Sequence, residues 1–183
     1  STTALYGHTI DADPQKAAWI TEETEALPKS IYHRTKLEAE SFLASVASTD
    51  LRITTLRMSR CFPEPAPLMA AYRLHRGIDA RDVAEGHHLA LVKPGAPYRT
   101  FILSGRHPFM HSDVEALRTN ASPVLEQRCP SLCSLFQERD WQLPQSIDRI
   151  YDASLAYREL GWHAKYGFES VIQQLDQNIP EVL

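Results

Sequence analysis

The sequence contains no apolar run near the ~20 residues that a membrane-spanning helix needs, and its opening, STTALYG, lacks the charged and apolar regions of a secretory leader. Cysteine is scarce: Cys129 and Cys133 follow a C-x3-C spacing and Cys61 is remote, so we expect reduced thiols in a cytoplasmic protein rather than a disulfide framework. Positive charge is not in excess either, because the net charge is -4 and the basic residues are scattered. Neither nucleic acid nor a membrane is therefore an expected partner.

The histidines do not predict a metal site, although the sequence has 8 of them. His87 and His88 are adjacent, so on a helix their side chains diverge by about 100°. His107 and His111 are four residues apart, but Pro108 between them argues against a regular helix. No HExxH or CxxC motif is present, and we expect no metal.

Strand-like and helix-like segments alternate along the chain, which favours an α/β fold with a parallel sheet. We expect residues 8–29 to form a long surface loop, and Leu37, Phe42, Leu43 and Val46 to form the buried stripe of the helix near residues 30–48. We expect strands at residues 3–7, 51–59 and 99–105, and helices at residues 30–48, 68–75, 81–93, 153–160 and 167–178, with two or three short helices between residues 112 and 139.

The predicted helix at residues 30–48 carries a tyrosine and a lysine on one face. Tyr32 and Lys36 are four residues apart, and residues at that spacing lie next to each other on a helix. A free phenol titrates near pH ~10, too high for a base at neutral pH, but an ammonium within about 4–6 Å favours the phenolate. Such a pair can exchange a proton with a substrate oxygen, and a Ser or Thr hydroxyl from a neighbouring strand would hold that oxygen. The spacing alone is also compatible with an ordinary amphipathic helix.

The segments around this helix add a resemblance. STTALYG lies upstream, and LRMSRCF, GIDARDVAEGHHLAL and YDASLAYRELGW follow downstream. This ordered set resembles the extended short-chain dehydrogenase/reductases, the NAD-dependent epimerase/dehydratase family, and its atypical members. In that family a strand ends in SSxxVYG, a Y-x-x-x-K helix follows, and the segments LRxxNVYGP, VHVDDVAxAHLLAL and DxSKAxxELGW come next. The resemblance covers nearly the whole chain and implies hydride exchange between NAD or NADP and a small-molecule substrate, with a nucleotide sugar as one candidate.

The resemblance also implies roles for individual residues near the Tyr32 helix. The family's catalytic hydroxyl falls on Thr2, with Ser1 and Thr3 as neighbours, and Thr3 is a candidate substrate contact. Tyr32 matches the acid/base tyrosine, and Lys36 matches the lysine that binds the nicotinamide ribose and assists the tyrosine.

Further candidates come from the segments downstream. Met58, Ser59 and Cys61 occupy the stretch that passes the nicotinamide in the family, and Arg60 stands where a substrate-binding asparagine is common. Arg149 lies where some nucleotide-sugar enzymes hold a substrate phosphate with an arginine, although a surface ion pair explains it equally well.

The chain departs from the family in its glycines and in one connection. The family binds its dinucleotide through a G-x-x-G-x-x-G turn, and the 7 glycines here make no such spacing. We therefore interpret the chain as a C-terminal portion that lacks about the first hundred residues of a family member and does not bind NAD(P) alone. The connection from Phe62 to Arg76 is short, which leaves open a reductase of a small carbonyl compound. A non-catalytic fragment or interaction module that keeps the fold is a further alternative.

The expected architecture is an incomplete Rossmann-like parallel sheet with a small helical substrate subdomain. We place the boundary at residue 105, so that residues 1–105 are the C-terminal part of the NAD(P)-binding domain and residues 106–183 the mostly helical subdomain. The strand at residues 3–7 would have an unpaired edge that is paired with another copy, covered or frayed. We also expect a homodimer through the helix at residues 30–48, which is the usual dimerisation helix of the family.

Overall fold

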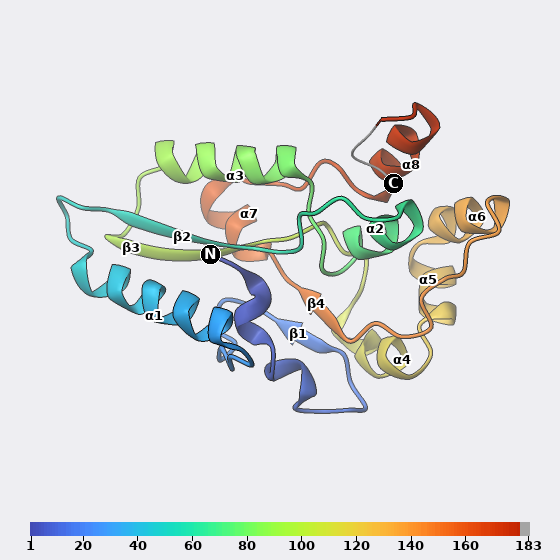
Figure 1. Ribbon diagram of the computed structural model, residues 1–183, viewed down its shortest axis with the longest axis horizontal. Coiled ribbons are helices and arrows are strands. Elements are labelled where there is room, and N and C mark those ends of the chain that lie inside the picture. The colour runs from blue at the N-terminus through green and yellow to red at the C-terminus, as the bar shows by residue number, and fades with distance from the viewer. Residues whose placement is uncertain (180–183) are drawn as a thin grey trace.

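The structure, a computed structural model, describes residues 1–179 and contains two parallel two-stranded sheets. In one, β2 (Ile53–Met58) pairs with β3 (Tyr98–Leu103) along its whole length. In the other, β1 (Ala18–Ile20) pairs with β4 (Arg149–Tyr151) (Figure 1). Because α2 (Ala66–Arg73) and α3 (Ala80–Val92) connect β2 to β3, the expected α/β fold with parallel strands is confirmed.

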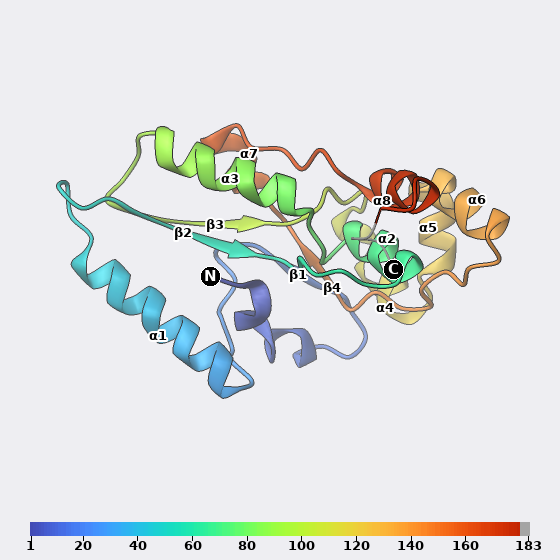
Figure 2. The ribbon, with the colours of Figure 1, turned by 45° about the horizontal axis from the view of Figure 1, so that its top comes forward.

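Helices cover both sides of the β2–β3 sheet. Helix α1 (Ile31–Val46) lies on one side, and α3 and α7 (Ser154–Leu160) lie on the other (Figure 2). Under α3 and α7, strand side chains Leu56 and Phe101 pack with Trp162, and all three are buried. The predicted strands near residues 51–59 and 99–105 and the predicted helices at residues 30–48, 81–93 and 153–160 are therefore confirmed, with ends shifted by a few residues.

The second half of the chain is mostly helical. Helix α2 packs against α8, and both contribute to an apolar cluster with the short helices beyond residue 110. Because α2 comes before residue 105, this cluster contains residues from both sides of the predicted domain boundary. The boundary at residue 105 therefore stays a prediction. The helical elements of this region are η3 (His111–Asp113), α4 (Val114–Thr119), α5 (Ser122–Arg128), α6 (Pro130–Glu138) and α8 (Phe168–Asp176).

The prediction of a strand at residues 3–7 is wrong. Thr3–Tyr6 form a 3-10 helix, η1, and the only strand-like pairing of this segment is a parallel bridge between Thr2 and Met58. The Thr2 hydroxyl caps η1 by accepting a hydrogen bond from the backbone of Ala4 at 3.1 Å. The consecutive residues Leu5 and Tyr6 are both fully buried, which a one-sided strand with alternating side chains would not allow. The expectation of an unpaired strand edge at residues 3–7 therefore does not apply.

The long surface loop expected at residues 8–29 also contains regular structure. A second 3-10 helix, η2, spans Thr9–Asp11, and β1 follows at Ala18–Ile20. Strand β1 is only three residues long, and its partner β4 lies about 130 residues away. No local pattern in the sequence predicts a pairing between segments so far apart.

The predicted buried stripe of α1 is wrong as well. Ser30 caps the helix as expected, but Phe42, Leu43 and Val46 are exposed to 65%, 39% and 40%, and Leu37 is half-buried. Within α1, Glu40 is the buried residue. Helix α1 is therefore held to the rest of the described chain mainly through polar contacts and leaves its apolar side chains uncovered.

Two absences complete the description of residues 1–179. None of their helices combines the length and the apolar composition needed to cross a bilayer. Within the same residues, no three His, Cys, Asp or Glu side chains lie close enough together to hold a metal ion.

Candidate functional site

The N-terminal segment lies alongside the first half of α1. At one end of the segment, a side chain on Gly7 would meet Lys29 and His33. Between its ends, helix η1 of this segment packs against α1. The segment that carries Thr2 and the helix that carries Tyr32 and Lys36 therefore face each other.

Tyr32 and Lys36 form a pair on the exposed surface of α1. The Lys36 ammonium lies 5.8 Å from the centre of the Tyr32 ring. The Tyr32 side chain is 52% exposed, and Lys36 is also exposed. The phenol can therefore be reached from outside, with a positive charge one helical turn away.

The neighbouring hydroxyls differ in their availability. Thr2 is half-buried and accepts the bond from Ala4, which leaves its own proton free to donate. Thr3 is buried, and its carbonyl oxygen accepts a hydrogen bond from the Tyr151 hydroxyl at 3.3 Å. No hydrogen bond joins Thr2 to Tyr32 within residues 1–179, so the two lie on adjacent elements without direct contact of this kind.

The end of β2 holds the residues expected to pass the nicotinamide. Ser59 is 5% exposed, and its backbone nitrogen donates to the Leu103 carbonyl at 2.9 Å. Its hydroxyl, however, is buried without a hydrogen-bond partner. Met58 and Cys61 are half-buried, and burial raises the pKa of the Cys61 thiol. Because an unpaired buried hydroxyl is unfavourable, the Ser59 Oγ atom is the feature of this stretch that fits a further ligand group.

The two arginines expected to bind substrate are paired with carboxylates of the chain. The Arg60 guanidinium forms an ion pair with Glu64, and the Arg149 Nε atom donates to Asp148 at 2.8 Å. Although burial works in the opposite direction, the bonds from Arg149 hold the pKa of Asp148 below its usual range. Neither arginine therefore offers an uncompensated charge.

An arginine that the sequence reasoning missed lies next to these pairs. The Arg76 guanidinium lies 4.7 Å from the centre of the Tyr72 ring, and the Arg60 guanidinium lies 5.9 Å from the same ring. Arg76 makes no ion pair within residues 1–179, although it lies close enough to Asp148 for its charge to help lower the pKa of that carboxyl. Arg60 and Arg76 are far apart in the sequence, so no sequence pattern predicted that they would lie on the same tyrosine ring. The parallel bridge between Arg60 and Gly77 brings them together.

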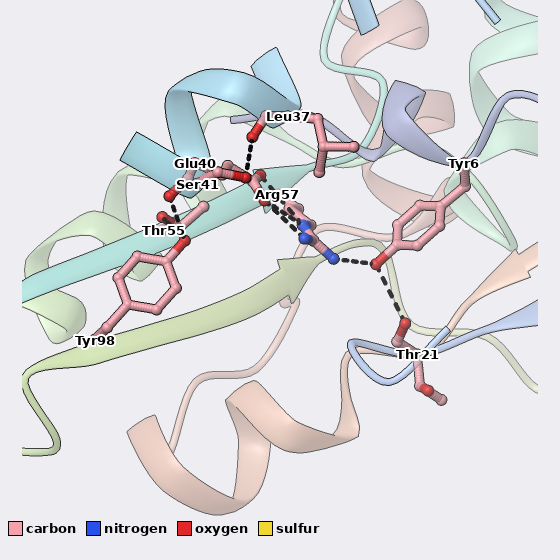
Figure 3. A network of polar contacts seen from close by, with 8 residues as sticks. All are labelled: Tyr6, Thr21, Leu37, Glu40, Ser41, Thr55, Arg57 and Tyr98. Atoms are coloured by element: carbon pink, nitrogen blue, oxygen red, sulfur yellow. Dashed lines mark hydrogen bonds and ion pairs between the residues drawn. The ribbon is translucent and has the colours of Figure 1, made fainter. Parts of the chain in front are cut away.

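A buried polar network, also missed by the sequence reasoning, fixes α1 to the sheet (Figure 3). Arg57 on β2 donates to both carboxylate oxygens of Glu40, the shortest of these bonds being 2.7 Å from Nη2 to Oε2. The Arg57 Nη1 atom donates to the Tyr6 hydroxyl at 2.6 Å, and that hydroxyl donates to the Thr21 carbonyl at 3.2 Å. The network thus ties together α1, β2, η1 and Thr21, the residue after β1. The sequence gave no signal for it, because a glutamate on an amphipathic helix is expected at the surface.

Comparison with known proteins gives a match in structure alone. No family model matches the sequence, and no curated protein matches it.

Among solved structures, a short-chain dehydrogenase/reductase superfamily protein from Agrobacterium tumefaciens with bound NAD aligns at a TM-score of 0.62 and 13% identity, over 97% of this chain and 64% of that one. RMD from Pseudomonas aeruginosa, complexed with NADPH, aligns at 0.59 and 15% identity, over 94% and 62% of the two chains. A UDP-glucose-4-epimerase from Stenotrophomonas maltophila, with NAD and formylated UDP-arabinopyranose bound, aligns at 0.54 and 22% identity, over 84% and 56%.

These alignments agree with the layers described above, and this chain spans about six tenths of the length of the structures it matches. The chain has the Rossmann-like α/β fold of NAD-dependent epimerases and short-chain dehydrogenase/reductases, over that part of their length.

Proposed function

We propose that this chain is part of an NAD(P)-dependent oxidoreductase of the epimerase/dehydratase type, in which Tyr32 moves a proton at the substrate oxygen. The observation that supports it is the exposed Tyr32–Lys36 pair, with 5.8 Å between ammonium and ring centre, beside the segment that carries Thr2. An isolated pair of this kind is compatible with helix surface. Its position in this fold, next to a free hydroxyl donor, is what favours catalysis.

Each residue has a distinct part in the proposed reaction. Tyr32 accepts a proton from the substrate hydroxyl in one direction and returns it to the carbonyl in the other. Lys36 stabilises the phenolate through its charge. Thr2 donates its hydroxyl hydrogen to the substrate oxygen and orients it, while the bond that it accepts from Ala4 holds the hydroxyl in place.

The residues of this chain fit one end of a nicotinamide cofactor. When bound, the nicotinamide accepts or supplies the hydride. Lys36 and Tyr32 would contact its ribose, and Met58, Ser59 and Cys61 would line its ring, with the unpaired Ser59 hydroxyl as a polar contact. The glycines of this chain do not form a pyrophosphate-binding turn, so we expect the pyrophosphate to need residues beyond these 183.

The test compares Tyr32→Phe with Tyr157→Phe in the full-length protein. Tyr157 is a matched control, because it is 53% exposed and lies on α7, across the sheet from α1. We expect Tyr32→Phe to lower kcat by about 10²–10⁴-fold, the usual contribution of a general acid or base, with little loss of cofactor affinity. Turnover of Tyr32→Phe equal to that of Tyr157→Phe would refute the assignment and favour a non-catalytic module.

A second candidate, a reductase of a small carbonyl compound, is favoured by the substrate side of the site. Glu64 and Asp148 neutralise Arg60 and Arg149, so two arginines that would bind a diphosphate are already occupied. The connection from Phe62 to Arg76 holds only α2, of 8 residues. Turnover of UDP-sugars against small aldehydes and ketones, followed by nicotinamide absorbance, separates the two classes of substrate.

We also propose a homodimer through α1. Ile31 and Phe42 are exposed to 72% and 65%, and Leu43 and Val46 extend the same uncovered helix. Apolar area of this kind on one helix favours a self-complementary two-fold contact. Phe42→Glu should convert a dimer to a monomer in light scattering, whereas Phe62→Glu, a phenylalanine exposed to 63% outside α1, should not. A monomeric wild-type protein would contradict the dimer.

A further inference from the structure

A cavity of about 360 Å³ lies between α2, the start of α3 and the end of α8. Helix α3 lies on the side of the β2–β3 sheet opposite α1 (Figure 2). Neither Tyr32 nor Lys36 lines the cavity. Its volume is at the lower end of the range for small-molecule sites. The residues that decide its chemistry are Cys61, Phe62, Met69, Arg73, Asp79 and Arg81.

Two arginines in this cavity share one carboxylate. Asp79 accepts from Arg73 Nη2 at 3.1 Å and from Arg81 Nη2 at 3.0 Å through Oδ2. Its other oxygen accepts from the Arg81 Nε atom at 2.8 Å and from the Arg81 backbone at 2.9 Å. Both oxygens of the carboxylate are therefore occupied, and they face two guanidinium groups.

Arg73 is left with a donor that has no acceptor. The residue is 7% exposed, and its Nη1 atom is buried without a hydrogen-bond partner. Arg73 lines the cavity together with Asp79, whose Oδ2 atom accepts from its Nη2 atom, so the guanidinium end of Arg73 is at this cavity. Asp82 does not supply the missing acceptor, because its two oxygens accept from the backbones of Lys165 and Tyr166 at 2.9 and 3.1 Å. An unpaired donor on a buried charged group is unfavourable, and an anionic ligand would remove that penalty.

Arg81 is held in a fixed orientation at the mouth of the cavity. Its guanidinium lies 3.6 Å from the centre of the Tyr166 ring, and Asp79 holds two of its nitrogens. The third nitrogen, Nη1, remains free among the bonds of residues 1–179. A guanidinium fixed in this way loses little freedom when it binds an anion.

The rest of the lining is apolar. Phe62 is exposed to 63%, and Pro63, Met69 and Ile78 continue the wall. An exposed phenylalanine next to an unpaired donor offers one surface for an apolar body and one for a charge. Inorganic phosphate would use the second surface alone.

We propose that this cavity binds a small organic carboxylate, whose oxygens accept from Arg73 and Arg81 and whose apolar body packs against Phe62. The carboxylate has two acceptor oxygens, which match the two guanidinium nitrogens left without an acceptor, Arg73 Nη1 and Arg81 Nη1. The cavity shares Cys61 with the proposed nicotinamide contacts. Its test measures ligand binding to variants of Arg81 and Asp79 and no turnover, so its failure would leave the oxidoreductase proposal intact.

The test measures benzoate binding to the full-length protein by calorimetry, with acetate and inorganic phosphate as comparison ligands. Benzoate should bind at one site, and acetate and phosphate should bind more weakly, because both lack the ring and use the guanidinium groups alone. Arg81→Gln should weaken benzoate by about tenfold, since it removes a charge-assisted bond. Arg81 is half-exposed, so this variant should fold. Arg52→Gln, an exposed arginine at the start of β2, is the matched control and should bind like wild type.

A second variant, Asp79→Asn, should strengthen benzoate binding instead of weakening it. Asp79 caps α3 through its side chain, and asparagine caps a helix equally well. Asp79→Asn therefore keeps the cap but frees both guanidinium groups, and benzoate should bind about tenfold more tightly. The proposal is overturned if wild-type protein shows no saturable benzoate binding, if Arg81→Gln binds like Arg52→Gln, if Asp79→Asn weakens binding while remaining folded, or if phosphate binds as tightly as benzoate.

Discussion

The attachment of α1 to the sheet through one buried ion pair leads to a prediction about stability. Glu40 is 5% exposed and the Arg57 side chain 11%, so the pair is removed from water. Glu40→Gln keeps the size of the side chain but leaves the Arg57 charge without its carboxylate. Breaking one partner of a buried pair costs about 3–5 kcal/mol, a large share of the ~5–15 kcal/mol that stabilises an ordinary domain.

The assay is urea unfolding of the full-length protein, followed by circular dichroism. Glu38→Gln is the matched control on the same helix, since Glu38 is exposed, and it should change the free energy of unfolding by less than ~0.5 kcal/mol. Tyr6→Phe should cost about 1–3 kcal/mol, because it removes one acceptor from Arg57. Replacing both members of the pair, Glu40→Leu with Arg57→Met, should recover most of the loss.

The same variant should affect catalysis, because α1 carries Tyr32 and Lys36 and has Glu40 as its buried residue. A change in the unfolding free energy of Glu40→Gln below ~1 kcal/mol would refute the reasoning. It would mean that apolar contacts, possible only if another part of the protein covers the exposed side of α1, hold the helix in place.

Three further predictions concern other buried positions. Burial, with a smaller contribution from neighbouring arginines, lowers the pKa of His75 to about 3 from 6.5. The resulting stability is present above pH 6.5 and is lost as the pH falls toward 3, so wild type should lose ~2 kcal/mol between pH 7 and pH 5 that His75→Gln does not, in urea unfolding at both pH values. Gly105→Ala should lower the free energy of unfolding by ~1–3 kcal/mol and with it the melting temperature, because the added Cβ atom would lie 2.3 and 2.7 Å from two backbone oxygens. Gly167→Ala is the control and should leave the melting temperature unchanged, since its Cβ atom would meet only the flexible Glu169 carboxylate. Trp162→Phe should cost ~1–3 kcal/mol in denaturant titration, since it leaves the Asp82 carbonyl without its 2.9 Å bond, and an unchanged midpoint would contradict this role.

The sequence by itself determined the features that depend on local spacing. The alternation of β-rich and helical segments predicted the parallel β2–β3 pair with its crossover helices, and the capping serine predicted the start of α1. The four-residue spacing of Tyr32 and Lys36 placed both on one face of that helix, because helical periodicity acts within a single turn. The roles assigned to Tyr32, Lys36 and Thr2 stay predictions that the proposed mutations test.

Only the tertiary structure decided which polar groups are buried and which partners they find. Glu40 looks like a surface residue of α1, but Arg57 from β2 binds it and itself donates to Tyr6 from η1. The sequence around Arg149 does not show whether this arginine binds a phosphate or Asp148, and the structure pairs it with Asp148. Strand β1 exists because it pairs with β4, far along the chain, and Thr2 pairs only with Met58 before the chain turns into η1. Burial and ion pairing depend on which segments meet in space, and no short-range periodicity encodes that choice.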